Sequence, residues 1–258
     1  MDQDYLLFIE KVKSLASIDL SLYKEAQMKR RLTSFRDKKG YSTFFELFKA
    51  MAKDRALLDE FLDRMTINVS EFWRNFRRWE ILRDVFIPEL LRRNGKLRCW
   101  SAACSTGEEP YTLAMILHEK GVLHSSSILA TDLDENVLEA AKKGIYHERS
   151  VREVPASYIQ TYLRKMPDGR WEVSDELRRS VRFLKHNLLA DRFETGYDLI
   201  ICRNVTIYFT DEAKNRLYHQ FSNSLRPGGI LFVGSTEQIF SPGRYGLETA
   251  DTFFYRRV

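Results

Sequence analysis

The sequence predicts an α/β fold with a mostly parallel sheet, preceded by an all-helical domain and interrupted by a small β insertion. Three observations lead to this prediction. Over residues 5–65 apolar side chains recur at helical spacing, without a strand pattern. From about residue 96 onward, short apolar runs alternate with amphipathic stretches, which is typical of a parallel sheet covered on both faces. Residues 146–180 break this alternation with Pro155 and an Asp-Gly turn at 168–169.

The N-terminal segment is predicted to be a small helical bundle. The apolar positions that recur at helical spacing are Leu6, Ile9, Met28, Leu32, Phe35, Phe44, Leu47, Phe48, Met51, Leu57, Leu58, Phe61, Leu62 and Met65. The basic stretch 24–39 is expected to form one helix that ends at Gly40, because glycine readily takes the conformation that closes a helix. Ser42 is expected to cap the next helix, since its hydroxyl can accept a hydrogen bond from an unpaired backbone N–H group.

The C-terminal part alternates strands and helices. The expected strands lie in residues 97–103, 127–134, 181–189, 197–205, 228–235 and 252–258. The expected helices lie in residues 108–120, 135–143 and 211–225. Right-handed crossovers between such elements give a mostly parallel sheet. The insertion at 146–180 is expected to hold a helix followed by a small hairpin.

The composition limits where the protein acts. The chain has three cysteines in 258 residues, Cys99, Cys104 and Cys202, and their spacing matches no zinc pattern, so no metal is expected. No apolar run approaches the roughly 18 residues needed to span a bilayer. The first residues are acidic, unlike the basic start of a signal peptide. These features predict a cytoplasmic protein with no direct membrane insertion.

The net charge of +5 is confined to one segment. Residues 24–39 contain seven basic and two acidic residues, so the remainder of the chain sums to zero. A local excess of positive charge favours a docking surface for an acidic partner. The alternative is an ordinary solvated helix face, and the sequence leaves both open.

Four loops follow predicted strands, at the edge where open parallel sheets bind ligands. The first contains Gly107, Glu108 and Glu109. Acids at the N-terminus of a helix would repel phosphate, so a cationic group such as an α-amino group suits this loop better. The alternative is that both acids only complement the dipole of the following helix.

The second and third loops carry groups suited to a nucleoside. Asp132 could accept hydrogen bonds from ribose hydroxyls, although it or Asp134 could instead cap the next helix. Asn187 beside Leu188 suits an adenine, by edge hydrogen bonds and packing, or is simply a turn asparagine.

The fourth loop contains Arg203, Asn204 and Tyr208, at the central strand end where a methyl acceptor would sit. Polar groups clustered there are costly unless they are satisfied, which favours a functional role. Acids in the first two loops and no phosphate motif together indicate S-adenosylmethionine, which combines adenosine, an amino-acid tail and a sulfonium.

Five segments carry a family resemblance. They are YKEAQMKRRL at 23–32, MTINVSEFWRN at 65–75, STGEEPYTLAM at 105–115, ATDLDENVLEAAKKGIY at 130–146 and ICRNVTIYF at 201–209. Together these segments resemble the chemotaxis-receptor glutamate O-methyltransferases (CheR family). Each segment is long, and the segments occur in the same order as in that family. The likeness is closest to Gram-positive members.

The resemblance implies a Rossmann-like class I S-adenosylmethionine-dependent methyltransferase fold and a protein-glutamate O-methyltransferase. It implies methyl transfer to the γ-carboxylate of specific glutamates on methyl-accepting chemotaxis receptors, with S-adenosylhomocysteine as the product. The implied domains are a helical receptor-docking domain at 1–70, a linker contributing to the active site at 71–90, and a cofactor-binding catalytic domain at 91–258 that contains the insertion.

The resemblance also implies site residues. Those expected to bind the cofactor are Asn68, Ser70, Arg74, Glu109, Asp132, Asn187, Leu188, Arg203 and Asn204. Glu109 is chosen over Glu108 as the acid that faces the methionine part. Arg74 and Tyr208 are expected to face the reacting carboxylate as catalytic residues; without the resemblance, Arg74 would be taken as a surface arginine.

The expected partner is the cytoplasmic helical domain of chemotaxis receptors, whose acidic helices would bind the basic segment 24–39. The residues expected to dock there are Lys24, Lys29, Arg31, Arg36 and Lys38; their seven-residue spacings place them along one side of a helix. The insertion has one glycine, Gly169, between 164 and 177, so no tether to a receptor pentapeptide is expected. A monomer without nucleic-acid binding is expected. The alternatives are a nucleic-acid methyltransferase of the same fold and a non-catalytic adaptor that senses S-adenosylmethionine.

Overall fold

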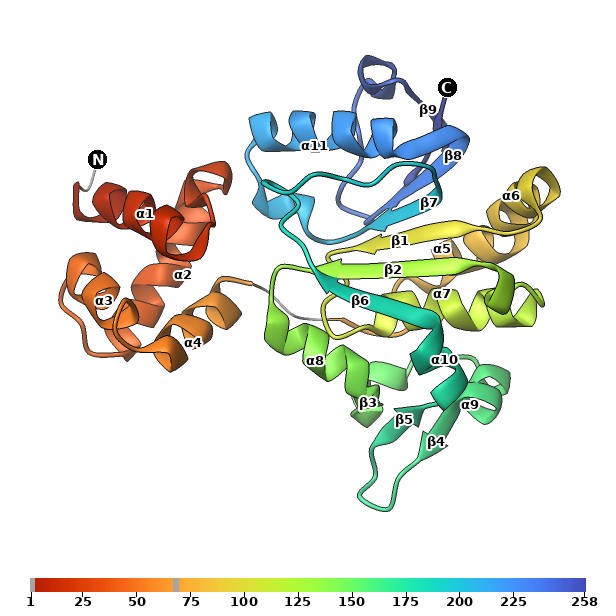
Figure 1. Cartoon of the computed structure of the whole chain (residues 1–258), viewed down its shortest axis with the longest axis horizontal. Coiled ribbons are helices and arrows are strands. Elements are labelled where there is room, and N and C mark those ends of the chain that lie inside the picture. The colour runs from red at the N-terminus through yellow and green to blue at the C-terminus, as the bar shows by residue number, and fades with distance from the viewer. Residues whose placement is uncertain (1–2, 67–69) are drawn as a thin grey trace.

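The computed structural model describes residues 3–66 and 70–258, which form a helical lobe beside a larger sheet domain (Figure 1). The helical lobe contains α1 (Gln3–Ala16), α2 (Glu25–Lys38), α3 (Phe44–Met51) and α4 (Arg55–Met65). Its apolar core is separate from the two cores that cover the sheet. The lobe therefore has the means to pack by itself, as the helical spacing predicts.

Two details of the helical lobe differ from the prediction. Thr43, and not Ser42, caps α3: its hydroxyl accepts from the Glu46 backbone N–H, and the Glu46 carboxylate bonds back to the Thr43 backbone. A threonine oxygen and a glutamate three residues later satisfy each other's backbone groups, which serine one position earlier cannot do. Leu6 is exposed, because α1 turns Tyr5, Phe8 and Val12 into the core instead.

The central sheet has seven strands in the order β6-β2-β1-β7-β8-β10-β9. Five are parallel: β1 (Arg98–Ala102), β2 (Ser127–Asp132), β6 (Val181–Lys185), β7 (Tyr197–Cys202) and β8 (Leu225–Val233). The C-terminal strands β9 (Leu247–Asp251) and β10 (Phe254–Arg257) are antiparallel. Of the seven strands of this sheet, the sequence predicted all except β9, in which the adjacent polar residues Glu248 and Thr249 interrupt any apolar run.

Helices cover both faces of the sheet (Figure 1). One face packs against α5 (Phe76–Ile81), α6 (Ile87–Asn94) and α7 (Glu108–Glu119), with a π-helical turn at Leu82–Phe86 joining α5 to α6. The other face packs against α11 (Asp211–Ser224). The helix α8 (Glu135–Lys143) begins at Asp134, whose carboxylate accepts from the Asn136 N–H at 2.9 Å. The sequence left open whether Asp132 or Asp134 caps this helix. Asp134 is the cap, so the Asp132 side chain can line the pocket.

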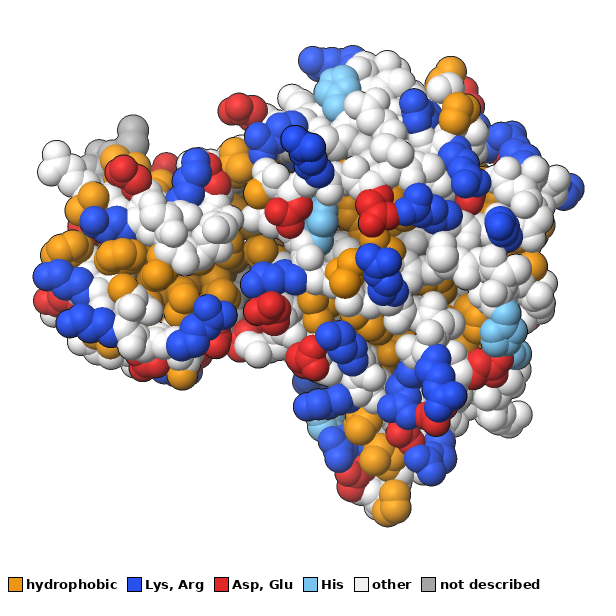
Figure 2. Space-filling view, in the orientation of Figure 1, with side chains coloured by type: hydrophobic (Ala, Val, Ile, Leu, Met, Phe, Trp, Pro, Cys, Tyr) orange, Lys and Arg blue, Asp and Glu red, His pale blue; other side chains and the backbone are white. Residues whose placement is uncertain are grey.

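The insertion projects from the sheet domain (Figures 1 and 2). It contains α9 (Ala156–Tyr162), the hairpin β4 (Leu163–Lys165) and β5 (Trp171–Val173), and α10 (Asp175–Ser180). A two-residue strand, β3 (Ile145–Tyr146), adds to the hairpin and makes a three-stranded sheet. The predicted helix and hairpin are confirmed, and the third strand is too short to be recognised from the sequence. Among the described residues, none of the helices has the length and apolarity needed to cross a bilayer.

Candidate active site

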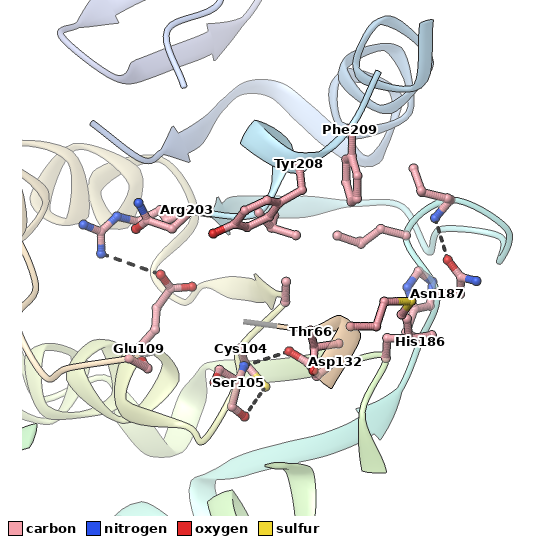
Figure 3. A pocket seen from close by; sticks show the side chains of 18 of the residues that line it. Thr66, Cys104, Ser105, Glu109, Asp132, His186, Asn187, Arg203, Tyr208 and Phe209 are labelled. Carbon is pink, nitrogen blue, oxygen red and sulfur yellow. Dashed lines mark hydrogen bonds and ion pairs between the residues drawn. The ribbon is translucent and has the colours of Figure 1, made fainter. Parts of the chain in front are cut away.

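A deep pocket lies between the helical lobe and the carboxyl ends of β1, β2 and β7 (Figure 3). In the sheet, β2 lies on one side of β1 and β7 on the other. The connections that follow these strands therefore run in opposite directions and leave a crevice between them. Met28, Arg31 and Met65 of the helical lobe close the crevice from outside. The pocket and its open mouth together comprise about 1060 Å³ of space, open solvent included.

The loop between β1 and α7 forms the floor of the pocket. Gly107 has φ +93°, and an added Cβ would lie 2.8 Å from the Cβ of Ala141, so no other residue fits there without displacing α8. Asp132, from the end of β2, accepts from the Ser105 backbone N–H at 2.8 Å. Burial raises the pKa of the Asp132 carboxyl. The loop and the second strand end are thus locked together around one carboxylate.

Glu109 and Arg203 form a buried ion pair at one end of the pocket (Figure 3). The carboxylate of Glu109 accepts from the Ser101 hydroxyl at 2.8 Å and lies 3.7 Å from Nη1 of Arg203. Burial raises the pKa of Glu109 to about 7, against the opposing attraction of Arg203. Burial also lowers the pKa of Arg203. This carboxylate is therefore poised to change charge near neutral pH, and a cationic ligand would favour its ionised form.

Arg203 also fixes the linker before α5. Its Nη2 donates to the backbone oxygen of Arg74 at 2.7 Å and to Oδ1 of Asn75 at 2.9 Å. Its guanidinium lies over the rings of Trp79 and Phe232, at 5.6 and 4.8 Å from their centroids. One buried side chain therefore connects the sheet, the linker and Glu109.

The loop after β7 places Tyr208 in the pocket. Asn204 takes a left-handed conformation (φ 61°), and Thr206–Tyr208 form a 3₁₀ turn. Figure 3 shows the Tyr208 hydroxyl directed toward the Arg203 end of the pocket. The guanidinium of Arg31 lies over the Tyr208 ring, 5.5 Å from its centroid.

The chain matches two family models. Residues 68–254 match the CheR methyltransferase S-adenosylmethionine-binding domain, and residues 3–66 match the CheR methyltransferase all-alpha domain. The chain belongs to the CheR methyltransferase family. The Gram-positive resemblance is confirmed by a chemotaxis protein methyltransferase of Listeria monocytogenes, 48% identical over 99% of this chain and 97% of that protein.

More distant CheR relatives match as well. The chemotaxis protein methyltransferase of Borreliella burgdorferi is 34% identical over 86% of this chain and 83% of its own length. Chemotaxis protein methyltransferase 1 of Pseudomonas aeruginosa is 35% identical over 92% of this chain and 90% of its own length. The class I S-adenosylmethionine-dependent methyltransferase fold expected from the sequence is therefore confirmed.

Most residues expected to form the CheR site lie around the pocket. Its walls include Ser70, Arg74, Glu109, Asp132, Asn187, Leu188, Arg203, Asn204 and Tyr208. Asn68 lies outside the described residues. Glu109 lines the pocket, whereas Glu108 points away and is buried with its carboxylate accepting from the Thr106 hydroxyl at 2.6 Å.

Asn187 uses its amide in local contacts. Its Oδ1 accepts from the Leu189 N–H at 2.9 Å, and its Nδ2 donates to the Ser17 backbone oxygen at 3.2 Å. The neighbouring His186 has a buried Nδ1 without a partner in the part of the chain that the structure describes. Of this pair, His186 offers the unused ring nitrogen at the end of the pocket opposite Glu109 (Figure 3).

The five basic residues predicted for docking have different surroundings. Arg31 is in the pocket wall, where its Nη1 donates to the Met65 backbone oxygen at 2.5 Å. Arg36 pairs with Asp37 at 2.7 Å, and Lys29 lies over the Tyr5 ring at 5.3 Å from its centroid. The other two, Lys24 and Lys38, mark the two ends of α2.

The polar groups of the pocket fit S-adenosylmethionine. Three buried polar atoms of residues that line the pocket lack a partner among the described residues: Ser105 Oγ beside Asp132, Nδ1 of His186 and Nε of Arg203. Unsatisfied buried groups are costly, so a polar ligand that bonds them is favoured. Glu109 would hold the α-amino group, Asp132 and Ser105 the ribose, and His186 and Leu188 the adenine side. Within the described residues, no cluster of three or more histidine, cysteine or acidic side chains could hold a metal ion.

Several lining residues were not assigned to the site from the sequence, among them Met28, Thr66, Ser105 and His186. Ser105 follows a left-handed Ala103 and itself has φ 48°, so its placement depends on backbone geometry that residue types do not reveal. Arg31 was expected on the docking surface, and its contact with Tyr208 depends on how the lobe packs against the sheet.

Proposed function

We propose that this chain transfers the methyl group of S-adenosylmethionine to the γ-carboxylate of specific glutamates on chemotaxis receptors, forming methyl esters. Membership of the CheR family, whose relatives are chemotaxis protein methyltransferases, supports this activity. The single structural observation that carries it is the pocket with Glu109 and Asp132 inside and Arg74 and Tyr208 among its walls. This arrangement can hold a cationic nucleoside and present an anion to it.

The acceptor needs no general base. A glutamate side chain has a pKa of about 4.3 and is already ionised at neutral pH. When bound, S-adenosylmethionine supplies a methyl group activated by the sulfonium charge. The task of the protein is therefore to align the acceptor oxygen and to exclude water from it.

Two side chains are proposed to hold the acceptor. The Arg74 guanidinium would donate to one carboxylate oxygen and leave the other free to attack. The Tyr208 hydroxyl would donate to the same group or wall the site. Because Arg203 donates a hydrogen bond to the backbone oxygen of Arg74, the position from which the Arg74 side chain extends is fixed.

The test is a methyl-transfer assay on receptor-containing membranes with labelled cofactor, followed by release of methanol by base. Base-labile label on the receptor is expected, and Arg74→Lys should lower kcat about 100-fold, because the shorter and more flexible lysine does not place its donor at the same point on the acceptor oxygen. Label on DNA or RNA would favour a nucleic-acid methyltransferase. Cofactor binding without turnover would favour the non-catalytic adaptor.

The receptor is proposed to dock on α2, beside the pocket mouth. Lys24, Arg31 and Lys38 lie along one side of α2, next to the pocket, and would face acidic receptor helices. Lys29 and Arg36, also expected to dock, lie on the other side of the helix, where Lys29 covers the Tyr5 ring and Arg36 pairs with Asp37. Residues 1–70 would form this docking domain, 71–90 the linker of the site and 91–258 the catalytic domain. A cytoplasmic monomer that uses no receptor pentapeptide tether is proposed, since the β4–β5 turn carries Gly169 as its one glycine.

A further inference from the structure

Glu237 lies in the loop after β8, next to the loop that carries Tyr208. It is 4% exposed, and it is absent from the pocket walls formed by the described residues. One carboxylate oxygen accepts from the backbone N–H groups of Asn204 at 2.5 Å and Gly234 at 2.9 Å. The other accepts from the N–H of Val205 at 2.9 Å and from the N–H and hydroxyl of Thr206 at 2.7 and 2.9 Å. Five donors therefore converge on one side chain.

The carboxylate joins the ends of two neighbouring parallel strands. Cys202 of β7 pairs with Val233 of β8, and the two loops that follow both bond to Glu237. Three consecutive N–H groups directed at one anion form a nest, which is a fixed concave site of positive potential. In this loop the anion belongs to the protein, so the nest shapes the loop and needs no ligand.

The approach of the carboxylate depends on Gly234. An added Cβ there would lie 2.3 Å from Oε2 of Glu237 and 2.9 Å from the backbone nitrogen of Asn204. Asn204 is held in the left-handed region, which non-glycine residues rarely adopt. The loop therefore keeps an uncommon backbone conformation while its N–H groups are directed at Glu237.

The anchored loop carries two residues of the pocket wall, Arg203 and Tyr208. Arg203 begins it, and Tyr208 stands near its end. The backbone oxygen of Tyr208 accepts from the Lys24 N–H at 2.8 Å, and Thr210 N–H donates to the Leu22 oxygen at 2.9 Å. The same loop thus joins the sheet to the segment that enters α2.

We propose that Glu237 is a positioning residue for methyl transfer, which sets the backbone of residues 203–208 so that Tyr208 stands correctly at the acceptor site and Arg203 keeps its contacts to the linker that carries Arg74. This rests on the proposed methyl transfer to a glutamate. Glu237 touches no reacting group by itself. A loop misplaced by about 1 Å can slow a reaction about 100-fold, so the anchor has a large effect from outside the pocket.

The test is the substitution Glu237→Gln. Glutamine has the shape of glutamate, but its NH₂ group takes the place of one oxygen and cannot accept hydrogen bonds from the backbone N–H groups that face it. The matched control is Asp198→Asn, at the opposite end of β7, where a buried carboxylate also accepts from a backbone N–H, that of Arg98 at 2.7 Å. Each change replaces a buried carboxylate with an amide, and only Glu237 is bonded to the loops that form the pocket.

The expected results separate positioning from stability. Per molecule able to bind S-adenosylhomocysteine, Glu237→Gln should lower kcat about 100-fold and change the receptor KM less than about 3-fold. Amide hydrogen exchange at residues 204–206 should accelerate at least 10-fold, while β1 stays protected. Asp198→Asn should leave kcat and exchange at 204–206 within about 3-fold of the wild type. Wild-type kcat in Glu237→Gln, or unchanged exchange at 204–206, would overturn the proposal.

A second variant covers the case in which Glu237→Gln does not fold. Thr206→Val removes the hydroxyl donor alone and should accelerate exchange at 204–206 with a smaller loss of kcat; no change in either would overturn the anchor. Because exchange is measured without a methyl acceptor, it tests the anchor even if the wild type methylates no receptor, which would refute the proposed function instead.

Discussion

Glu109→Gln is predicted to separate the stability of the protein from its affinity for the cofactor. Glutamine keeps the size of the side chain and its hydrogen bond from Ser101, and it removes the charge. It therefore resembles the protonated carboxyl, which burial favours in the ligand-free protein. The variant should be the more stable protein at alkaline pH and the weaker binder.

The magnitude follows from the pKa. An unfolded glutamate has a pKa of about 4.3, and in the folded chain burial raises the pKa of Glu109 to about 7. Between these values the folded state binds more protons than the unfolded state, so the free energy of unfolding falls as pH rises, and the loss is nearly complete by about pH 8. The whole effect is about 4 kcal/mol, of which about 1 kcal/mol develops between pH 6 and 8.

The assay is urea unfolding of both proteins at pH 6 and 8, without ligand. Other titrating groups are common to both, so the difference in unfolding free energy isolates Glu109, and it should grow by about 1 kcal/mol in favour of the variant at pH 8. Calorimetry with S-adenosylhomocysteine at pH 8 should show affinity weakened about 10- to 100-fold, the effect of one charge-assisted hydrogen bond. A stability difference that is the same at both pH values would refute the reasoning.

Three further changes probe the linker, the strand ends and docking. Arg203→Lys should lower the free energy of unfolding in urea by about 2 kcal/mol and make the linker easier to cleave by protease. An ammonium cannot keep the hydrogen bonds to both the Arg74 backbone oxygen and Asn75. Unchanged cleavage of the linker would contradict this. Gly234→Ala should destabilise the protein by about 1–3 kcal/mol in the same measurement, through the clash with Glu237, and wild-type stability would show that the loops can relax. Lys24→Glu combined with Lys38→Glu should raise the receptor KM and reduce its salt dependence without changing affinity for S-adenosylhomocysteine; equal loss of both would exclude a docking role.

Periodicity was sufficient for most of the fold. The apolar runs around Cys99, Ile200 and Leu231 predicted parallel strands because strands buried on both faces must be apolar throughout. The face that α1 turns inward was not predictable, since Leu6 and Ile9 fit a helical stripe as well as Tyr5 and Phe8 do. Choosing between two apolar faces requires the neighbouring helix, α3.

The candidate site was predictable where chemistry lies at strand ends. Glu109, Asp132 and Arg203 follow strands, and parallel strands bring their carboxyl ends to one edge. Glu237 also follows a strand, but the sequence gives no sign that its carboxylate is enclosed by backbone N–H groups. Backbone donors have no sequence signature, because every residue except proline carries one.

By itself, the sequence determined the helical lobe, the parallel sheet, the edge at which the pocket opens and the family. Those features depend on residue type and spacing along one chain, which are local quantities. The tertiary structure alone decided that Arg31 faces Tyr208 and that Glu237 fastens two loops together. These depend on the direction of side chains and backbone N–H groups across segments far apart in the sequence, which only packing sets.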